Sequence, residues 1–246
     1  MEPILYRITR PIINILFKIF FRPTYIGLEN IPTKGSVVLA GNHTNNLDCI
    51  LLITSTKRTI HFLAKDELLK GGKKIIFKNM GIIPVNRRIH DNKALKKAEE
   101  ELKGNKVIGI FPEGTFSKVK GKLLPFKIGA VKMTYDTNSA LVPFTITGTY
   151  KLLRRGITIT FYPKYLVQEP LGEANEKLRD FLQKELDRKK EWFLSILDMK
   201  FFRFLGFKKK PNAPWNKYYQ KKDMNLSIPD ISLYDNFLNS MKKYPN

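Results

Sequence analysis

The chain has 246 residues, of which 43% are hydrophobic, which suits a folded domain with a sizeable core and excludes a wholly disordered protein. Its single cysteine, Cys49, excludes a framework of internal disulfides. The 44 basic and 22 acidic residues give a net charge of +22, which predicts a polyanionic neighbour: nucleic acid, an anionic membrane surface or a phosphorylated substrate.

The first predicted element is an amphipathic helix over residues 4–21. Most of its positions are apolar, and its polar residues share one narrow face: Arg7, Arg10, Asn14, Lys18 and Arg22. A transmembrane span needs about 20 mostly uncharged residues, and a signal peptide would be followed by a small-residue cleavage site that is missing here. We therefore interpret residues 1–24 as a helix that contacts a membrane interface; ordinary packing on the core is the alternative.

A polar junction follows the first predicted buried strand, residues 36–40. The junction runs from Asn42 to Asp48 and leads into a helix over about 47–56, for which Asn45 or Asn46 is the predicted N-cap. Residues five apart on a continuous helix point about 140° away from each other. The break before the helix therefore allows the Asp48 carboxylate to reach the His43 imidazole, as a base and its orienter would.

Strand and helix patterns then alternate along the chain. The predicted strands are 59–64, 82–86, 106–111, 140–146 and 157–162, and the predicted helices are 91–103, 126–136 and 173–190. This order predicts an α/β fold with a mostly parallel central sheet flanked by helices. His43, Arg87 and Glu113 each follow a strand end, where such sheets bind ligands, so we expect them to share one site.

The chemistry of this site is predicted from its side chains. His43 can take a proton from a hydroxyl, and Asp48 can fix its tautomer. A histidine beside an acid can also be a purely structural pair. No G-x-S-x-G nucleophile elbow occurs in the sequence, and no obvious nucleophile stands next to the pair. A direct attack by an acceptor alcohol on an activated acyl group would need only a base, an orienter and an electrostatic clamp.

Two further groups complete the predicted site. Lys65 and Arg87 are candidates for holding a phosphate. The tight turn Glu113-Gly114-Thr115 offers a carboxylate, backbone N–H groups and a hydroxyl to an acceptor. Histidines and cysteines with metal-ligand spacing are lacking, so we predict no metal site.

Four blocks of sequence resemble the glycerophosphate/1-acylglycerol-3-phosphate acyltransferase family of phospholipid synthesis. They are Asn42 to Asp48, Lys65 to Leu68 together with Gly81 to Arg87, Phe111 to Thr115, and Ala140 to Pro143. Their order and spacing agree with the family over residues 25–165.

The resemblance implies transfer of a fatty acyl group from acyl-carrier protein or acyl-coenzyme A to the free hydroxyl of a lysophospholipid, 1-acyl-sn-glycerol 3-phosphate above all. It gives His43 the role of general base and Asp48 that of its partner. It places Glu113, Gly114 and Thr115 at the acceptor and Arg87 on the acceptor phosphate. It implies no cofactor beyond the thioester co-substrate, and peripheral or monotopic attachment to the cytoplasmic face of the cell membrane.

One residue departs from the family pattern. The third block usually continues with arginine, but Phe116 follows Thr115 here. Lys118 or Arg87 would compensate for the missing charge, or the acceptor would be another lysolipid or an acylated amino-acid lipid. A non-catalytic lipid-binding or membrane-binding homologue is the remaining interpretation.

The predicted organisation has three parts: residues 1–24, an acyltransferase domain over 25–190, and an extension over 191–246. The extension mixes aromatic and basic residues, a composition that suits a membrane interface or single-stranded nucleic acid. We expect an anionic membrane surface and no nucleic acid as a partner.

Overall fold

The computed structural model of the protein describes residues 4–65, 81–85, 92–117, 119 and 121–204, with the side chains beyond Lys190 left out. Contacts divide the chain into a unit of residues 1–190 and a unit of residues 191–246. The first unit contains the sheet and the predicted site, and everything below concerns that unit.

Seven strands form one sheet in the order β1-β7-β6-β2-β5-β3-β4. The strands are β1 (Thr24–Ile26), β2 (Val37–Gly41), β3 (Ile60–Lys65), β4 (Ile83–Val85), β5 (Val107–Ile110), β6 (Ala140–Gly148) and β7 (Ile157–Phe161). The five strands from β6 to β4 are parallel to one another, whereas β7 is antiparallel to β6 and parallel to β1. The prediction of a mostly parallel sheet is therefore confirmed.

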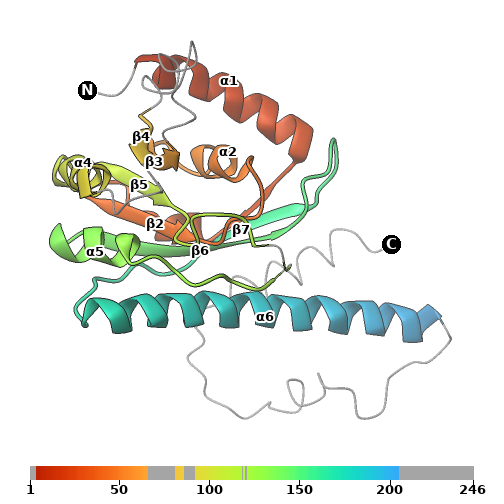
Figure 1. Ribbon diagram of the computed structural model, residues 1–246. Helices are drawn as coiled ribbons and strands as arrows, with labels where there is room; N and C mark the ends of the chain where they lie inside the picture. The colour runs from red at the N-terminus through yellow and green to blue at the C-terminus, as the bar shows by residue number, and fades with distance from the viewer. Residues whose placement is uncertain (1–3, 66–80, 86–91, 118, 120, 205–246) are drawn as a thin grey trace. The chain divides into compact units, whose positions relative to one another are not determined.

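Helices cover both faces of this sheet. They are α1 (Ile4–Phe21), the short 3₁₀ helix η1 (Leu28–Asn30), α2 (Asp48–Ile53), α4 (Asn92–Lys103), α5 (Gly129–Asp136) and α6 (Leu171–Phe204). Figure 1 shows α1 and α2 on one side of the sheet and α5 and α6 on the other. α6 begins close to the predicted start of the last helix, but it runs past the predicted end at residue 190.

The strand β2 divides the core into two clusters, because successive side chains of a strand point to opposite faces. Val37 and Leu39 belong to the cluster beneath α1 and α2. Val38 and Ala40 belong to the cluster beneath α4, α5 and α6. All four are fully buried, so β2 lies in the middle of the protein and its end is held rigidly from both sides.

A partly buried lysine attaches α6 to the sheet. Lys189 donates hydrogen bonds of 2.8 Å to Thr145 Oγ1 and 2.7 Å to Thr160 Oγ1, two residues that face each other across β6 and β7. Burial lowers the pKa of the Lys189 ammonium to about 8, since a low-polarity environment disfavours its charge.

The helix α1 presents opposite faces to the protein and to the outside. Tyr6 and Phe17 are buried in the core, and Arg10, half buried, donates to the backbone oxygen of Thr56. The outward face is apolar and exposed: Ile8, Ile12, Ile15, Leu16, Ile19 and Phe20. Among the described residues, no helix has an apolar stretch long enough to cross a bilayer.

Candidate active site

His43 lies two residues beyond the end of β2, on a turn that is fixed to β6. The Asn42 side chain accepts the Ile146 N–H at 2.7 Å and donates to the Ile146 oxygen at 2.9 Å. Gly41 makes the close approach possible, because a Cβ there would stand 2.3 Å from the Phe144 oxygen. These contacts position the backbone of His43 at the carboxyl edge of the sheet, as the strand-end argument predicts.

The imidazole of His43 meets the carboxylate of Asp48, which confirms that the chain breaks between them. Nδ1 of His43 lies 3.0 Å from Oδ2 of Asp48, the first residue of α2. The predicted N-cap is wrong: Leu47 takes that position, and the Asn45 side chain instead accepts the Leu47 N–H at 3.0 Å. An asparagine turn thus takes the place of helix capping at the start of α2. The helix ends at Ile53, earlier than the predicted end at about residue 56.

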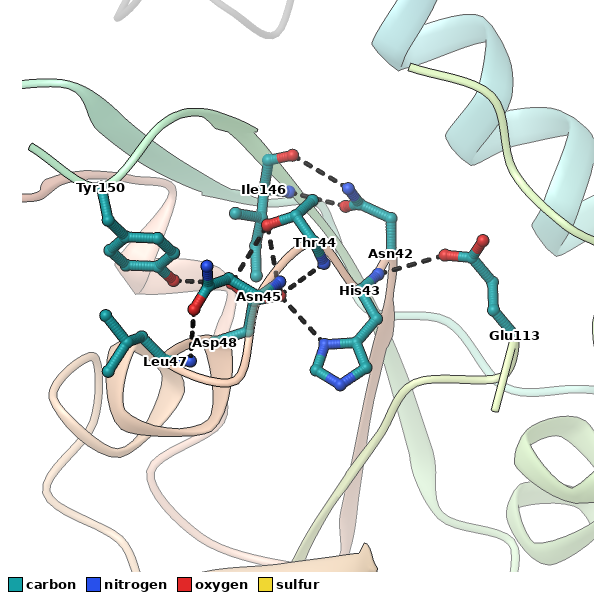
Figure 2. Close-up of polar contacts among 9 residues, drawn as sticks. All are labelled: Asn42, His43, Thr44, Asn45, Leu47, Asp48, Glu113, Ile146 and Tyr150. Atoms are coloured by element: carbon teal, nitrogen blue, oxygen red, sulfur yellow. Dashed lines mark hydrogen bonds and ion pairs between the residues drawn. The ribbon is translucent and has the colours of Figure 1, made fainter. Parts of the chain in front are cut away.

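Asp48 is fully buried and surrounded by hydrogen-bond donors (Figure 2). Its carboxylate accepts the backbone N–H of Thr44 at 2.6 Å, that of Asn45 at 2.8 Å and the hydroxyl of Tyr150 at 2.6 Å. A carboxylate acts here as acceptor only, so the proton of the His43–Asp48 hydrogen bond belongs to Nδ1. Nε2, on the far side of the ring, then carries the lone pair that a general base needs.

Tyr150 is one of the site residues that sequence reasoning missed; Lys127, described below, is another. Tyr150 follows β6, 102 positions from Asp48, and its ring packs against Phe17 and Phe21 of α1. Burial, followed by the negative charge of Asp48, raises the pKa of the Tyr150 hydroxyl, which therefore stays protonated and donates. A tyrosine after the fourth block carries no local pattern that signals this contact.

Glu113 joins two loops of the site through its carboxylate. Oε1 accepts the backbone N–H of His43 at 3.1 Å, and Oε2 accepts that of Leu124 at 2.9 Å. Burial raises the pKa of Glu113, and the two N–H donors oppose that shift. The residue fixes the backbone of His43, while its predicted contact with an acceptor stays a prediction.

Two phenylalanines enclose the His43 ring. Phe111 stacks on it with ring centres 3.9 Å apart and planes 11° apart, and Phe116 lies against it at 4.3 Å and 56°. These ring contacts restrict the orientation of the imidazole. The residue that departs from the family pattern, Phe116, is therefore a wall of the site.

The turn after Glu113 brings a lysine close to the site. Gly114 has φ +69°, a conformation that favours glycine, and its N–H bonds the Phe111 oxygen at 2.9 Å. A Cβ at Gly114 would lie 3.1 Å from Cε and 3.3 Å from Nζ of Lys127. The Lys127 N–H bonds the Pro112 oxygen, so the ammonium stands over the predicted acceptor turn.

The structure thus brings together His43, Asp48, Glu113 and Gly114. Thr115 continues the same turn and is exposed. The side chain of Lys65, at the end of β3, and the residues Arg87 and Lys118 lie outside the described part of the structure. Cys49 is half buried in α2, and burial raises the pKa of its thiol to about 12.

Comparison with known proteins identifies the family of this chain. Residues 22–147 match the model of the family described as Acyltransferase. The chain is 35% identical over 134 residues to the 1-acyl-sn-glycerol-3-phosphate acyltransferase of Borreliella burgdorferi, an alignment that covers 53% of each protein. It is 30% identical over 153 residues to the protein of that name from Bacillus subtilis, covering 60% of this chain and 72% of the other.

The chain spans about half the length of the first of these relatives. A solved structure, the 1-acyl-sn-glycerophosphate (LPA) acyltransferase PlsC from Thermotoga maritima, superposes with a TM-score of 0.59. That alignment covers 76% of this chain and 78% of the other at 23% identity, which shows a common fold.

Proposed function

The chain belongs to the acyltransferase family, and from this membership we propose that it transfers a fatty acyl group to the free hydroxyl of a lysophospholipid. The observation that carries the proposal is the bond from Nδ1 of His43 to Asp48, which leaves Nε2 as a base. This pair lies in the block Asn42 to Asp48, where the family resemblance implies a general base and its partner.

The reaction proceeds by direct attack. The acceptor oxygen forms a bond to the thioester carbonyl carbon, and its proton passes to Nε2 of His43. The carbon–sulfur bond then breaks, and the leaving thiolate takes the proton from the imidazolium. Asp48 stabilises the imidazolium between these steps, since its buried carboxylate already lies 3.0 Å from Nδ1.

The acceptor we favour is 1-acyl-sn-glycerol 3-phosphate. The names of the relatives from Borreliella burgdorferi and Bacillus subtilis support it. Lys127, whose ammonium stands over Gly114, would supply a charge for the acceptor phosphate in place of the arginine that Phe116 replaces. The acyl donor in this proposal is acyl-carrier protein or acyl-coenzyme A.

A different acceptor is the second candidate, because one observation favours it. Phe116 lies against the His43 ring, where it offers an apolar surface instead of a guanidinium. Such a wall suits a lysolipid with a less charged head group, or an acylated amino-acid lipid.

The proposed reaction takes place at a membrane. The outward face of α1 supports this proposal, because an exposed apolar stripe bordered by Arg7 and Lys18 suits an interface with anionic head groups. We place that interface on the cytoplasmic face of the cell membrane, where acyl-carrier protein and acyl-coenzyme A are found.

The test is lipid acylation by the purified chain. One labelled acyl thioester is assayed against a panel of lysolipids, with His43→Ala beside the original chain and His61→Gln as a control at a buried histidine outside the site. Loss of a general base costs about 10²–10⁴ in rate. Near-normal turnover by His43→Ala would refute the mechanism, and lysolipid binding without turnover on any acceptor would refute the activity.

Activity on 1-acyl-sn-glycerol 3-phosphate would support the favoured acceptor. Activity restricted to other lysolipids would indicate that Phe116 changes the acceptor specificity. The variant Phe116→Arg separates the two cases further, since a restored guanidinium should favour the phosphorylated acceptor.

A further inference from the structure

The connection between β6 and β7 contains an exposed segment that has no role in the proposed reaction. We call residues 151–155, Lys-Leu-Leu-Arg-Arg, the β6–β7 tip. Leu152 and Leu153 are 63% and 52% exposed, and all three cations beside them are exposed. Two adjacent exposed leucines flanked by basic residues are typical of a segment that meets an apolar phase beneath anionic groups.

The β6–β7 tip is held beside α1 by specific contacts. The backbone N–H of Leu153 bonds the oxygen of Phe20, and Leu153 has φ +58°, a backbone conformation unfavourable for a leucine. The ring of Tyr150, just before the tip, packs edge-on against Phe21 with centres 5.7 Å apart. Figure 1 shows this loop rising next to the C-terminal end of α1.

The tip extends the outward apolar face of α1. That face ends at Ile19 and Phe20, and the Phe20 backbone is bonded to Leu153. Exposed cations lie along both parts of the combined surface: Arg7, Lys18, Lys151, Arg154 and Arg155. These apolar and basic side chains come from two segments more than 130 positions apart, yet they form one surface.

We propose that the β6–β7 tip is a second membrane contact, which inserts Leu152 and Leu153 beneath the head groups of an anionic bilayer while Lys151, Arg154 and Arg155 bind lipid phosphates. Charge complementarity selects this occupant, because the tip and the adjoining end of α1 carry cations and no acidic residue. The leucines favour a bilayer over nucleic acid, which offers no apolar interior. Two separated contacts would fix the orientation of the protein on the membrane surface. A single helix would still allow the protein to rotate about the helix axis.

The test measures binding of the full chain to vesicles by co-sedimentation, without any acyl transfer. The vesicles contain phosphatidylglycerol and phosphatidylcholine in equal parts, or phosphatidylcholine alone. Replacing both leucines by serine should weaken binding to the anionic vesicles at least about tenfold, because two buried apolar side chains are lost. The triple change of Lys151, Arg154 and Arg155 to glutamine should weaken it about as much, and only for the anionic vesicles.

The matched control is Leu166→Ser. Leu166 is 46% exposed, and its neighbour Tyr165 packs against the opposite face of the sheet. Its replacement should leave vesicle binding unchanged. Circular dichroism of each variant establishes that it is folded.

A second readout reports insertion directly. An environment-sensitive label on Leu153→Cys should brighten and shift to shorter wavelength on anionic vesicles, whereas the same label on Leu166→Cys should not. Unchanged binding of the double serine variant together with an unshifted label at position 153 would overturn the proposal. If single-stranded oligonucleotides at moderate salt displaced the protein from the vesicles, the proposal would be overturned and nucleic acid would be the favoured partner. Because neither readout needs turnover, failure here leaves the proposed acyltransferase reaction untouched.

Discussion

Tyr150 and His43 bind opposite oxygens of the same carboxylate: the tyrosine hydroxyl donates to Oδ1 of Asp48 at 2.6 Å, and the imidazole lies 3.0 Å from Oδ2. Asp48 is therefore oriented by a residue that also packs against α1. In the proposed reaction, Tyr150 would be a positioning residue for the dyad that acts through Asp48.

Tyr150→Phe tests this role, because it removes the hydroxyl and keeps the ring. The only other donor to Oδ1 is the Thr44 hydroxyl at 3.2 Å among the described contacts. We expect the free energy of unfolding to fall by about 2 kcal/mol and kcat to fall about tenfold, which equals 1.4 kcal/mol in the barrier. Urea denaturation and acylation kinetics measure the two effects.

The control for Tyr150 is Tyr25→Phe. Tyr25 also shares a 2.6 Å hydrogen bond, but with the hydroxyl of Thr54 and not with a carboxylate. This variant should lose stability and keep its kcat. Equal kcat values in the two variants would contradict the positioning role of Tyr150.

Glu113→Gln should disturb the backbone of His43. An amide nitrogen must then face one of the two backbone N–H groups that Glu113 now accepts, those of His43 and Leu124. An amide N–H that faces a backbone N–H leaves both donors without an acceptor, which lowers the free energy of unfolding by about 1–3 kcal/mol. We therefore expect lower stability in urea and a lower kcat. Glu101→Gln, at a half-buried glutamate paired with Lys106, should leave kcat unchanged; a kcat for Glu113→Gln equal to that control would refute the bracing role.

Gly114→Ala should displace the Lys127 ammonium, because the new methyl group stands 3.1 Å from Cε of the lysine. We expect a raised KM for a phosphorylated acceptor, with a loss of about 1–2 kcal/mol in stability from the positive φ. Lys127→Met should raise KM alike without that loss. Gly121→Ala is the control, since Gly121 has φ +77° and open space around it; a rise in KM there as well would contradict the role of Lys127.

The titration of Lys189 should make the folded protein more stable as the pH rises from about 8 to 10.5. Its pKa is about 8 in the folded protein against 10.5 for an ordinary lysine, so in this window the unfolded chain binds a proton that the folded chain does not. Unfolding then becomes less favourable as pH rises, by at most about 3.4 kcal/mol at 1.36 kcal/mol per pKa unit.

The measurement compares urea denaturation of the original chain and of Lys189→Met at several pH values. The difference in unfolding free energy between them should change across the window and stay constant below pH 8. Lys184→Met, at an exposed position of the same helix, should show no such change. A difference that does not vary with pH would contradict the lowered pKa of Lys189.

The fold and the dyad could be predicted because their signals are local. Apolar runs place the strands, and the junction between β2 and α2 contains both His43 and Asp48. The contact of Tyr150 with Asp48 could not be predicted, since it joins residues 102 positions apart and depends on the packing of the tyrosine against α1.

Tertiary packing also separates residues that the sequence pattern treats alike. The helical wheel places Arg7 and Arg10 on one polar face, yet Arg7 is exposed and Arg10 turns toward Thr56. Phe116 was recognised as a departure from the family pattern, but its contact with the His43 ring follows from the turn at Gly114, which a one-dimensional pattern does not define.

The pairing of β1 with β7 has a consequence for synthesis. Thr24 lies opposite Thr158, 134 positions later, so β1 can join the sheet only when β7 has left the ribosome. At about 5–20 residues per second, this delay lasts about 7–27 s. During that interval α1, which directly precedes β1, is already outside with its apolar outward face uncovered. The nascent chain therefore has time to reach a lipid surface before the sheet is complete, so the membrane contact proposed for α1 would precede the pairing of β1 with β7.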